Sequence, residues 1–145
     1  MNYYVTKSNP YRYRLKDALE EYSRSAEVDW TTCKNAKPGG ILLIAASGKD
    51  AGIYAKATIV TEPIKDIPDD KYWVNPEDGA KKTWMVEITS LQNLTKHPIT
   101  ERELRACPEL VRLAEWLHIQ GTNRYLDDSE ADAMNDLLKR YRDKT

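Results

Sequence analysis

The pattern of apolar and polar positions predicts a chain in which strands occupy the middle and helices lie toward both ends. In one segment the alternation is regular, with Trp84, Val86 and Ile88 on one side and the intervening residues on the other. Residues 62–82 are rich in Pro and Asp and predict a long surface loop. Apolar and β-branched runs predict strands over 2–6, 41–46, 52–61, 83–89 and 121–126.

Apolar residues recur at helical spacing near both ends of the chain. The first set predicts a helix over 16–25, and Thr100 with Glu103 forms a capping box that predicts a second helix. Pro108 opens a third helix, and Ser129 with Asp132 predicts the cap of a last one. The apolar stripes of these helices consist of Leu15, Ala18, Leu19 and Tyr22; Leu110, Leu113, Ala114 and Leu117; and Met134, Leu137, Leu138 and Tyr141. This order predicts a single α+β domain over residues 1–145, with a curved sheet or small β-barrel flanked by helices.

Composition limits the partners. Lys and Arg number 22 against 23 Asp and Glu, so the net charge of −1 gives no global attraction to polyanions. The first 60 residues carry a net charge of +3 and the remainder −4, so a nucleic acid would face the N-terminal half. The other interpretation of this asymmetry is a mixed, solvated surface.

Cysteine usage and hydropathy predict a reduced, cytoplasmic protein without a membrane partner. Cys33 and Cys107 lie far apart, and neither has the spacing of a zinc site. No apolar run approaches the roughly 20 residues that a membrane span needs. We therefore expect neither a metal nor another cofactor.

Motifs of the common enzyme classes are absent from the sequence, which contains no GxSxG, Walker, HExxH or GxGxxG motif. His97 and His118 stand alone, and Cys33 beside Lys34 lacks a second catalytic partner. The sequence therefore predicts a protein that is not an enzyme.

A polar cluster near the N-terminus predicts a pocket for a flat, polar ligand. Trp30, in the polar stretch 29–34, offers a plane on which a nucleobase can stack. Lys7, Ser8, Asn9 and Asn35 offer donors and acceptors for a base edge. The phosphate contacts that we predict are Arg12, Arg14, Lys34, Lys37 and Lys49. The alternative is that Trp30 is a core residue and Asn9-Pro10 merely a turn.

Several short motifs occur in a characteristic order along nearly the whole chain. They are Tyr3 to Pro10, Trp30 to Lys34-Asn35, Gly39-Gly40 before the strand 41–46, Ser47 with Gly52-Ile53, Trp84 with Val86, and Gln120 to Arg124. Together they resemble the EVE domain, a member of the PUA-like superfamily. The chain departs from the family pattern in having Asn9 where the family usually has Glu, and Gly40 where it usually has Asp.

The resemblance implies a PUA-like fold and a non-catalytic reader that holds a flipped, modified base in an aromatic pocket. The base expected is methylated or hydroxymethylated cytosine in DNA, and the expected role is the specificity module of a modification-dependent restriction system. A fused or associated nuclease or motor domain would then be the partner. Asn9 would decide which base fits. The pocket that we expect consists of Lys7, Ser8, Asn9, Trp30, Thr31, Asn35, Ser47 and Trp73.

Three alternatives stay open. One is an RNA-binding PUA-like module that reads modified or structured RNA. Another is a reader of methylated adenine, because Lys7-Ser8-Asn9 and Trp30-Thr31-Thr32 also resemble the YTH readers. The third is a hydrolase of the ASCH type, whose Gly-x-Lys-x-x-Glu-x-Arg signature the sequence does not contain. For Trp84 we expect core packing, because its strand alternates so regularly.

Overall fold

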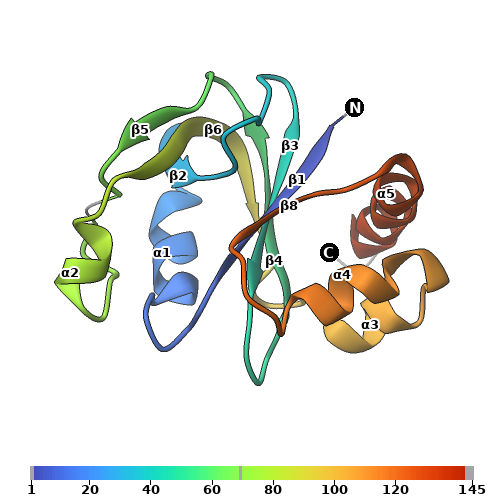
Figure 1. The fold of residues 1–145 in the computed structure, drawn as a ribbon. Helices are drawn as coiled ribbons and strands as arrows, with labels where there is room; N and C mark the ends of the chain where they lie inside the picture. The colour runs from blue at the N-terminus through green and yellow to red at the C-terminus, as the bar shows by residue number, and fades with distance from the viewer. Residues whose placement is uncertain (1, 69, 143–145) are drawn as a thin grey trace.

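A curled mixed sheet forms the centre of the computed structural model, which describes residues 2–68 and 70–142 (Figure 1). Its strand order is β2-β6-β4-β3-β1-β8, with β5 paired to β6 and β7 paired to β4. β1 and β3 run parallel, and the other pairs run antiparallel. The strands are β1 Tyr3–Ser8, β2 Glu27–Thr31, β3 Ile41–Ala46, β4 Gly52–Ile59, β5 Ile64–Asp66, β6 Thr83–Asn93, β7 Ile99–Thr100 and β8 Asn123–Tyr125.

The sheet curls into a half-barrel because its long strands bend. β6 pairs with β2 and β5 along its first half and with β4 along its second half. The register of β4 shifts between Lys56 and Thr58, and Ser90 in β6 has a positive φ of 55°. Irregularities of this kind bend a strand and increase its twist. The structure confirms the predicted curved mixed sheet flanked by helices.

The central strands are buried on both faces, because helices cover each side of the sheet (Figure 1). Every residue of β3 is buried. Leu43 and its alternate neighbours belong to one core, with α3, η1, α4 and α5. Leu42 and its alternate neighbours belong to a second core, with α1, β2 and β6. The helical elements are α1 Leu15–Tyr22, α2 Pro76–Gly79, α3 Glu101–Arg105, η1 Pro108–Leu110, α4 Val111–Trp116 and α5 Asp128–Arg142.

The predicted helices are present, but the cap predicted for the last one is wrong. The Oγ1 atom of Thr100 accepts a hydrogen bond from the backbone N–H of Glu103 at 3.2 Å, as the capping box predicts. The final helix begins before Ser129, because Asp127 and Glu130 form a reciprocal cap instead. The apolar stripes are buried as expected except for Tyr22, which is half-buried, while the side chain of Tyr141 lies outside the described residues. None of the helices in the described ranges is long and apolar enough to cross a bilayer.

Two segments that we predicted as loops contain regular structure. Residues 27–31 form β2, so Trp30 is in a strand rather than a polar loop. Within residues 62–82, β5 pairs with β6 and α2 forms a single turn. The polar composition misled the prediction because both β2 and β5 bury little of their side-chain surface.

Candidate functional site

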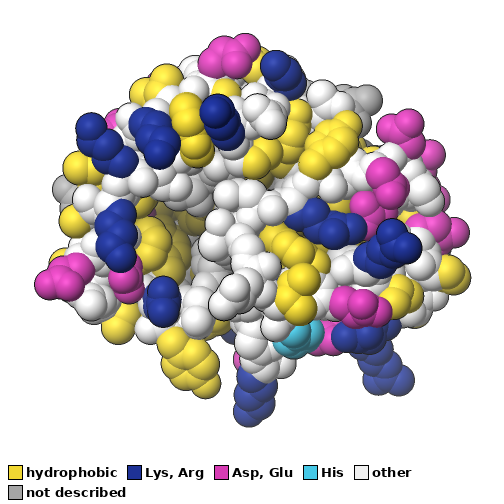
Figure 2. Space-filling model, in the orientation of Figure 1, with side chains coloured by type: hydrophobic (Ala, Val, Ile, Leu, Met, Phe, Trp, Pro, Cys, Tyr) yellow, Lys and Arg dark blue, Asp and Glu magenta, His cyan; other side chains and the backbone are white. Residues whose placement is uncertain are grey.

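A cavity of about 370 Å³ opens on one face of the molecule, in the size range of small-ligand pockets. Figure 2 shows a hollow on this face, with hydrophobic side chains in its depth and Lys or Arg side chains around its rim. Four parts of the chain supply the walls: the end of β1 with its following turn, β2, the segment 68–85, and the start of β8. The lining residues are Lys7, Ser8, Asn9, Arg12, Tyr13, Asp29, Trp30, Thr31, Pro68, Asp70, Trp73, Asp78, Lys81, Thr83, Met85, Thr122 and Asn123.

Two tryptophans from distant segments line this cavity, with Tyr13 in contact with both. The rings of Tyr13 and Trp30 meet edge to face at a centroid distance of 6.0 Å, and those of Tyr13 and Trp73 at 4.8 Å. Backbone pairing of Tyr13 with Trp73 brings the two segments together. Gly79 packs so closely on the Trp73 ring that a Cβ at this position would lie 2.5 Å from Cδ1. Trp73 therefore has a fixed position at the wall.

Trp30 has two structural roles. Its side chain is only 5% exposed and belongs to the core beneath α1, as the alternative interpretation of the sequence held. It also lines the cavity, so a part of its surface faces the open space. Trp84 is the reverse case: we predicted a core residue, but it is half-buried between the ammonium groups of Lys34 and Lys65. Trp84 does not line the cavity.

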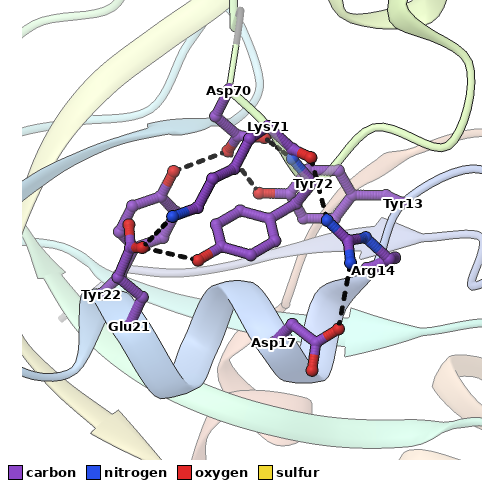
Figure 3. Close-up of polar contacts among 8 residues, drawn as sticks. All are labelled: Tyr13, Arg14, Asp17, Glu21, Tyr22, Asp70, Lys71 and Tyr72. Carbon is purple, nitrogen blue, oxygen red and sulfur yellow. Dashed lines mark hydrogen bonds and ion pairs between the residues drawn. The ribbon is translucent and has the colours of Figure 1, made fainter.

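A network of tyrosines and carboxylates holds the segment 70–73 against α1 (Figure 3). The hydroxyls of Tyr13 and Tyr22 donate to Oδ2 of Asp70 at 2.6 and 2.8 Å. The backbone N–H of Tyr72 donates to the other oxygen of Asp70 at 2.9 Å. Glu21 accepts hydrogen bonds from the Tyr72 hydroxyl and the Lys71 ammonium. Asp70 thus connects the cavity wall to the first helix.

Burial and the nearby Asp70 carboxylate raise the pKa of Tyr13 and of Tyr22 far above 10, the ordinary value for tyrosine. The folded protein therefore keeps these protons at pH values where the unfolded chain loses them. Their contribution to stability is complete below pH 10 and falls as pH rises above it.

We expect the free energy of unfolding to fall as the pH rises above 10. Each pH unit above 10 removes about 1.4 kcal/mol through a tyrosine that keeps its proton in the folded protein, as Tyr13 does. Urea unfolding followed by circular dichroism measures this decline. Tyr13→Phe should show a shallower decline than the wild type, and equal declines in the two proteins would contradict the assignment.

The ammonium of Lys7 is engaged by the protein, although Lys7 lines the cavity. It donates hydrogen bonds to the backbone oxygens of Trp116 and Ile119, the latter at 2.6 Å. It also lies 4.2 Å from the centroid of the Trp116 ring. Burial lowers the pKa of Lys7 below its ordinary value. Lys7 therefore connects β1 to the end of α4, where helix carbonyls favour a cation.

Asn9 shapes the turn that follows β1. Its Oδ1 accepts a hydrogen bond from the backbone N–H of Tyr11 at 2.9 Å, which also fixes the orientation of its amide. The backbone oxygen of Asn9 accepts from the N–H groups of Arg12 and Tyr13. The Nδ2 group is the part of Asn9 that the turn does not use, so a ligand would meet a donor here.

The remaining predicted pocket residues divide into two groups. Ser8 and Thr31 line the cavity, and the Thr31 hydroxyl lies 3.5 Å from that of Thr6. Asn35 is exposed and lines neither of the two main cavities. Ser47 lies on a second cavity of about 360 Å³ on the other side of the turn that follows β1.

The predicted phosphate contacts also separate in space. Arg12 lies on the first cavity, whereas Arg14 and Lys49 lie on the second. Lys34 is beside Trp84, and Lys37 is exposed, with its backbone N–H donating to the Tyr4 hydroxyl. Within the described ranges, Arg12 has no ion-pair or side-chain hydrogen-bond partner, so its charge is available to a ligand.

Sequence reasoning missed ten of the 17 residues that line the cavity, and three of these ten differ clearly in chemistry. Asp29 places a carboxylate beside Trp30, and Met85 supplies an apolar, 7% exposed side chain. Lys81 adds a second cation, which has no ion-pair partner among the described residues. The proximity of Asp29 to Trp30 in the sequence was a usable signal. No such signal marked Met85, because the alternation in its strand predicted only which side chains pack in the core.

The described part of the chain contains no group of three His, Cys, Asp or Glu side chains placed to hold a metal ion. The cavity instead combines aromatic faces, one apolar wall, free donors and a free carboxylate. Such a set can bind a flat ring by stacking and read its edge by hydrogen bonds.

Comparison with known proteins identifies a family and a shared fold. The model of the EVE domain family matches residues 2–131. A hypothetical protein from Leishmania major matches with a TM-score of 0.68 and 17% identity, covering 99% of this chain and 96% of that one. The human THYN1 protein, in complex with DNA containing 5-methylcytosine, matches with a TM-score of 0.65 and 20% identity, covering 94% and 97%.

A third structure has the same fold but another family name. A mutant form of the ZmASCH protein from Zymomonas mobilis matches with a TM-score of 0.56 and 12% identity, covering 93% of this chain and 95% of that one. At such identities these likenesses show the fold alone. Comparison with curated protein sequences gave no match.

Proposed function

The chain belongs to the EVE domain family, and on that premise we propose that it is a non-catalytic reader that holds a flipped, modified cytosine of DNA in the cavity. The observation that carries the proposal is one cavity lined by Trp30 and Trp73 together with the Asp29 carboxylate and the amide of Asn9. The human THYN1 protein bound to 5-methylcytosine DNA has the same fold, which supports this choice of ligand.

Stacking and hydrogen bonding together would offset the cost of flipping. Removing a base from a duplex costs a few kcal/mol, and stacking on an aromatic ring returns about 1–3 kcal/mol per base. Cytosine presents an amino donor, for which Asp29 offers an acceptor. The Nδ2 donor of Asn9 suits the ring nitrogen or carbonyl oxygen of the same base. Arg12 and Lys81 can then contact phosphates at the rim.

The apolar part of the cavity favours a methyl group. Met85 offers a contact that unmodified cytosine would leave unused. Burying one methyl or methylene group contributes about 0.8 kcal/mol, which corresponds to about a fourfold gain in affinity. We expect at least this preference for 5-methylcytosine over cytosine.

Fluorescence anisotropy at fixed salt tests the proposal with duplexes that differ in one base: cytosine, 5-methylcytosine or 5-hydroxymethylcytosine. Fixed salt matters because phosphate contacts make affinity salt-dependent. Equal affinities for all three would refute the proposed function. Tighter binding to a matched RNA, or to a duplex with N6-methyladenine, would favour the alternative readers instead.

Asp29→Ala provides the residue-level test. We expect it to weaken binding to the modified duplex by about 5- to 100-fold, because a base donor loses a charged acceptor. Glu27→Ala is the matched control, since Glu27 is exposed on the same strand but does not line the cavity. Equal losses in the two variants would indicate a general charge effect rather than base reading.

We further propose that the reader acts as the specificity module of a modification-dependent restriction system. Binding alone leaves the modified DNA chemically unchanged, so this role requires a nuclease or a motor as a fused or associated partner. Sequencing the neighbouring coding region and co-purifying the tagged chain from its native cells would test the association. Recovery of the chain without such a protein would contradict this role but not base recognition.

A further inference from the structure

Tyr11 carries an unusually exposed aromatic side chain beside the cavity. Its side chain is 84% exposed, the highest value among the large exposed hydrophobic residues in the described ranges. Asn9, two residues before it, and Arg12, directly after it, line the cavity that holds Trp30 and Trp73. Nothing in the core requires an aromatic ring at this position.

The turn that presents Tyr11 is held rigidly. The backbone N–H of Tyr11 donates to the side chain of Asn9, and those of Arg12 and Tyr13 donate to the Asn9 carbonyl. The backbone oxygen of Arg12 in turn accepts from the N–H of Val74 at 2.9 Å. The turn is thus braced both internally and against the segment that contains Trp73. The backbone of the turn therefore loses little conformational entropy when the ring meets a ligand.

Tyr11 also lies at the boundary between two cavities. Tyr11 lines the second cavity together with Pro10, whereas Asn9 and Arg12 line the first. The turn joins β1 to α1 and lies at the same end of the molecule as the β3–β4 hairpin (Figure 1). Three cations, Arg14, Lys16 and Lys49, line the second cavity together with the carboxylates of Asp17 and Asp50. Arg14 pairs with Asp17 at 3.7 Å, so Lys16 near the turn and Lys49 on the hairpin supply the positive charge that remains. These charges suit the phosphates of a strand that passes the turn.

From this arrangement we propose that Tyr11 inserts into the base stack of duplex DNA and occupies the space left by the base that enters the first cavity. The inference rests on the function proposed above. A flipped base leaves a gap bounded by two flat faces, and an aromatic ring can stack on either of them. Side chains that enter a base step in this way are known to unstack and bend duplexes. The cations of the second cavity hold the strand beside the gap.

Three DNA probes of one sequence separate insertion from other roles. The first is a duplex with 5-methylcytosine paired to guanine, the second is the same modified strand alone, and the third is a duplex with 5-methylcytosine opposite an abasic site. Tyr11→Ala should weaken binding to the paired duplex by about 5- to 150-fold, which corresponds to one lost stacking contact. Binding to the single strand should change by less than about twofold, because no stack is opened.

The abasic probe and two further variants complete the test. Opposite an abasic site, opening the pair costs less, so the loss from Tyr11→Ala should be smaller than on the paired duplex. Tyr11→Phe should bind like the wild type, because the ring and not the hydroxyl does the stacking. Tyr125→Ala is the control for residue type, since Tyr125 is 51% exposed and lines neither cavity.

Each failure has its own signature. If Tyr11→Ala weakens binding to all three probes equally, or to none of them, insertion is refuted. A wild-type preference for the modified single strand would then still support the cavity as the binding site. If the wild type shows no preference for the modified base in any probe, both proposals fall. A thermal unfolding midpoint of Tyr11→Ala within a few degrees of the wild type excludes unfolding as the cause.

Discussion

Replacing Trp30 by alanine is expected to destabilise the protein and to abolish its preference for a modified base. Trp30 is 5% exposed and packs edge to face on Tyr13 and Tyr22 at centroid distances of 6.0 and 6.1 Å. Truncating a buried tryptophan to alanine costs about 3–5 kcal/mol, because it removes apolar contacts and leaves a cavity. Chemical unfolding monitored by circular dichroism measures this loss.

A gentler substitution separates binding from folding. Trp30→Leu keeps an apolar side chain in the core but removes the aromatic face, so the variant should fold with reduced stability. Its affinity for the modified duplex should fall by about 5- to 150-fold, the equivalent of about 1–3 kcal/mol of stacking. Trp84→Leu is the matched control, because Trp84 is also a strand tryptophan but is only half-buried and lies outside the cavity. A Trp30→Leu protein that retains the full preference would exclude Trp30 as the stacking plane.

Replacing Asp70 by alanine is expected to release one wall of the cavity. Its carboxylate accepts hydrogen bonds from the hydroxyls of Tyr13 and Tyr22 and from the backbone N–H of Tyr72. Loss of the acceptor leaves these donors without partners, and each unsatisfied buried donor costs about 1–3 kcal/mol. Because part of the network is exposed to water, we expect a total loss of about 3 kcal/mol.

The same variant should also weaken base binding, because Asp70 anchors the segment that carries Trp73. Glu20→Ala is the control. Glu20 lies on α1, as Glu21 and Tyr22 of the network do, but its ion pair with Arg24 is exposed. Removing an exposed pair should change stability by less than about 1 kcal/mol. Comparable losses from the two substitutions would show that the tyrosine network is not what holds the wall.

Local patterns in the sequence predicted much of the fold correctly. The strand 41–46 has the predicted bounds, and Leu110, Leu113, Ala114 and Leu117 are all buried. These predictions depend on side-chain spacing and on caps formed within a few residues. The predicted resemblance to the EVE domain is likewise confirmed by a family model over residues 2–131. Strand β2 was missed because only one of its five residues is buried, so no alternation marked it.

Local sequence patterns do not predict which residues of the site contact one another. The sequence by itself determined which residues were candidates for the site: a tryptophan in a polar stretch and the polar cluster after the first strand. It also determined most of the helices and strands that contain them. Only the tertiary structure decided which residues meet: Trp30 faces both core and cavity, and Trp73 reaches it through pairing with Tyr13. It also decided that the Lys7 ammonium contacts carbonyls at the end of α4. The physical reason is that such contacts join segments far apart in the chain, and their partners are set by strand pairing and packing rather than by neighbouring residues.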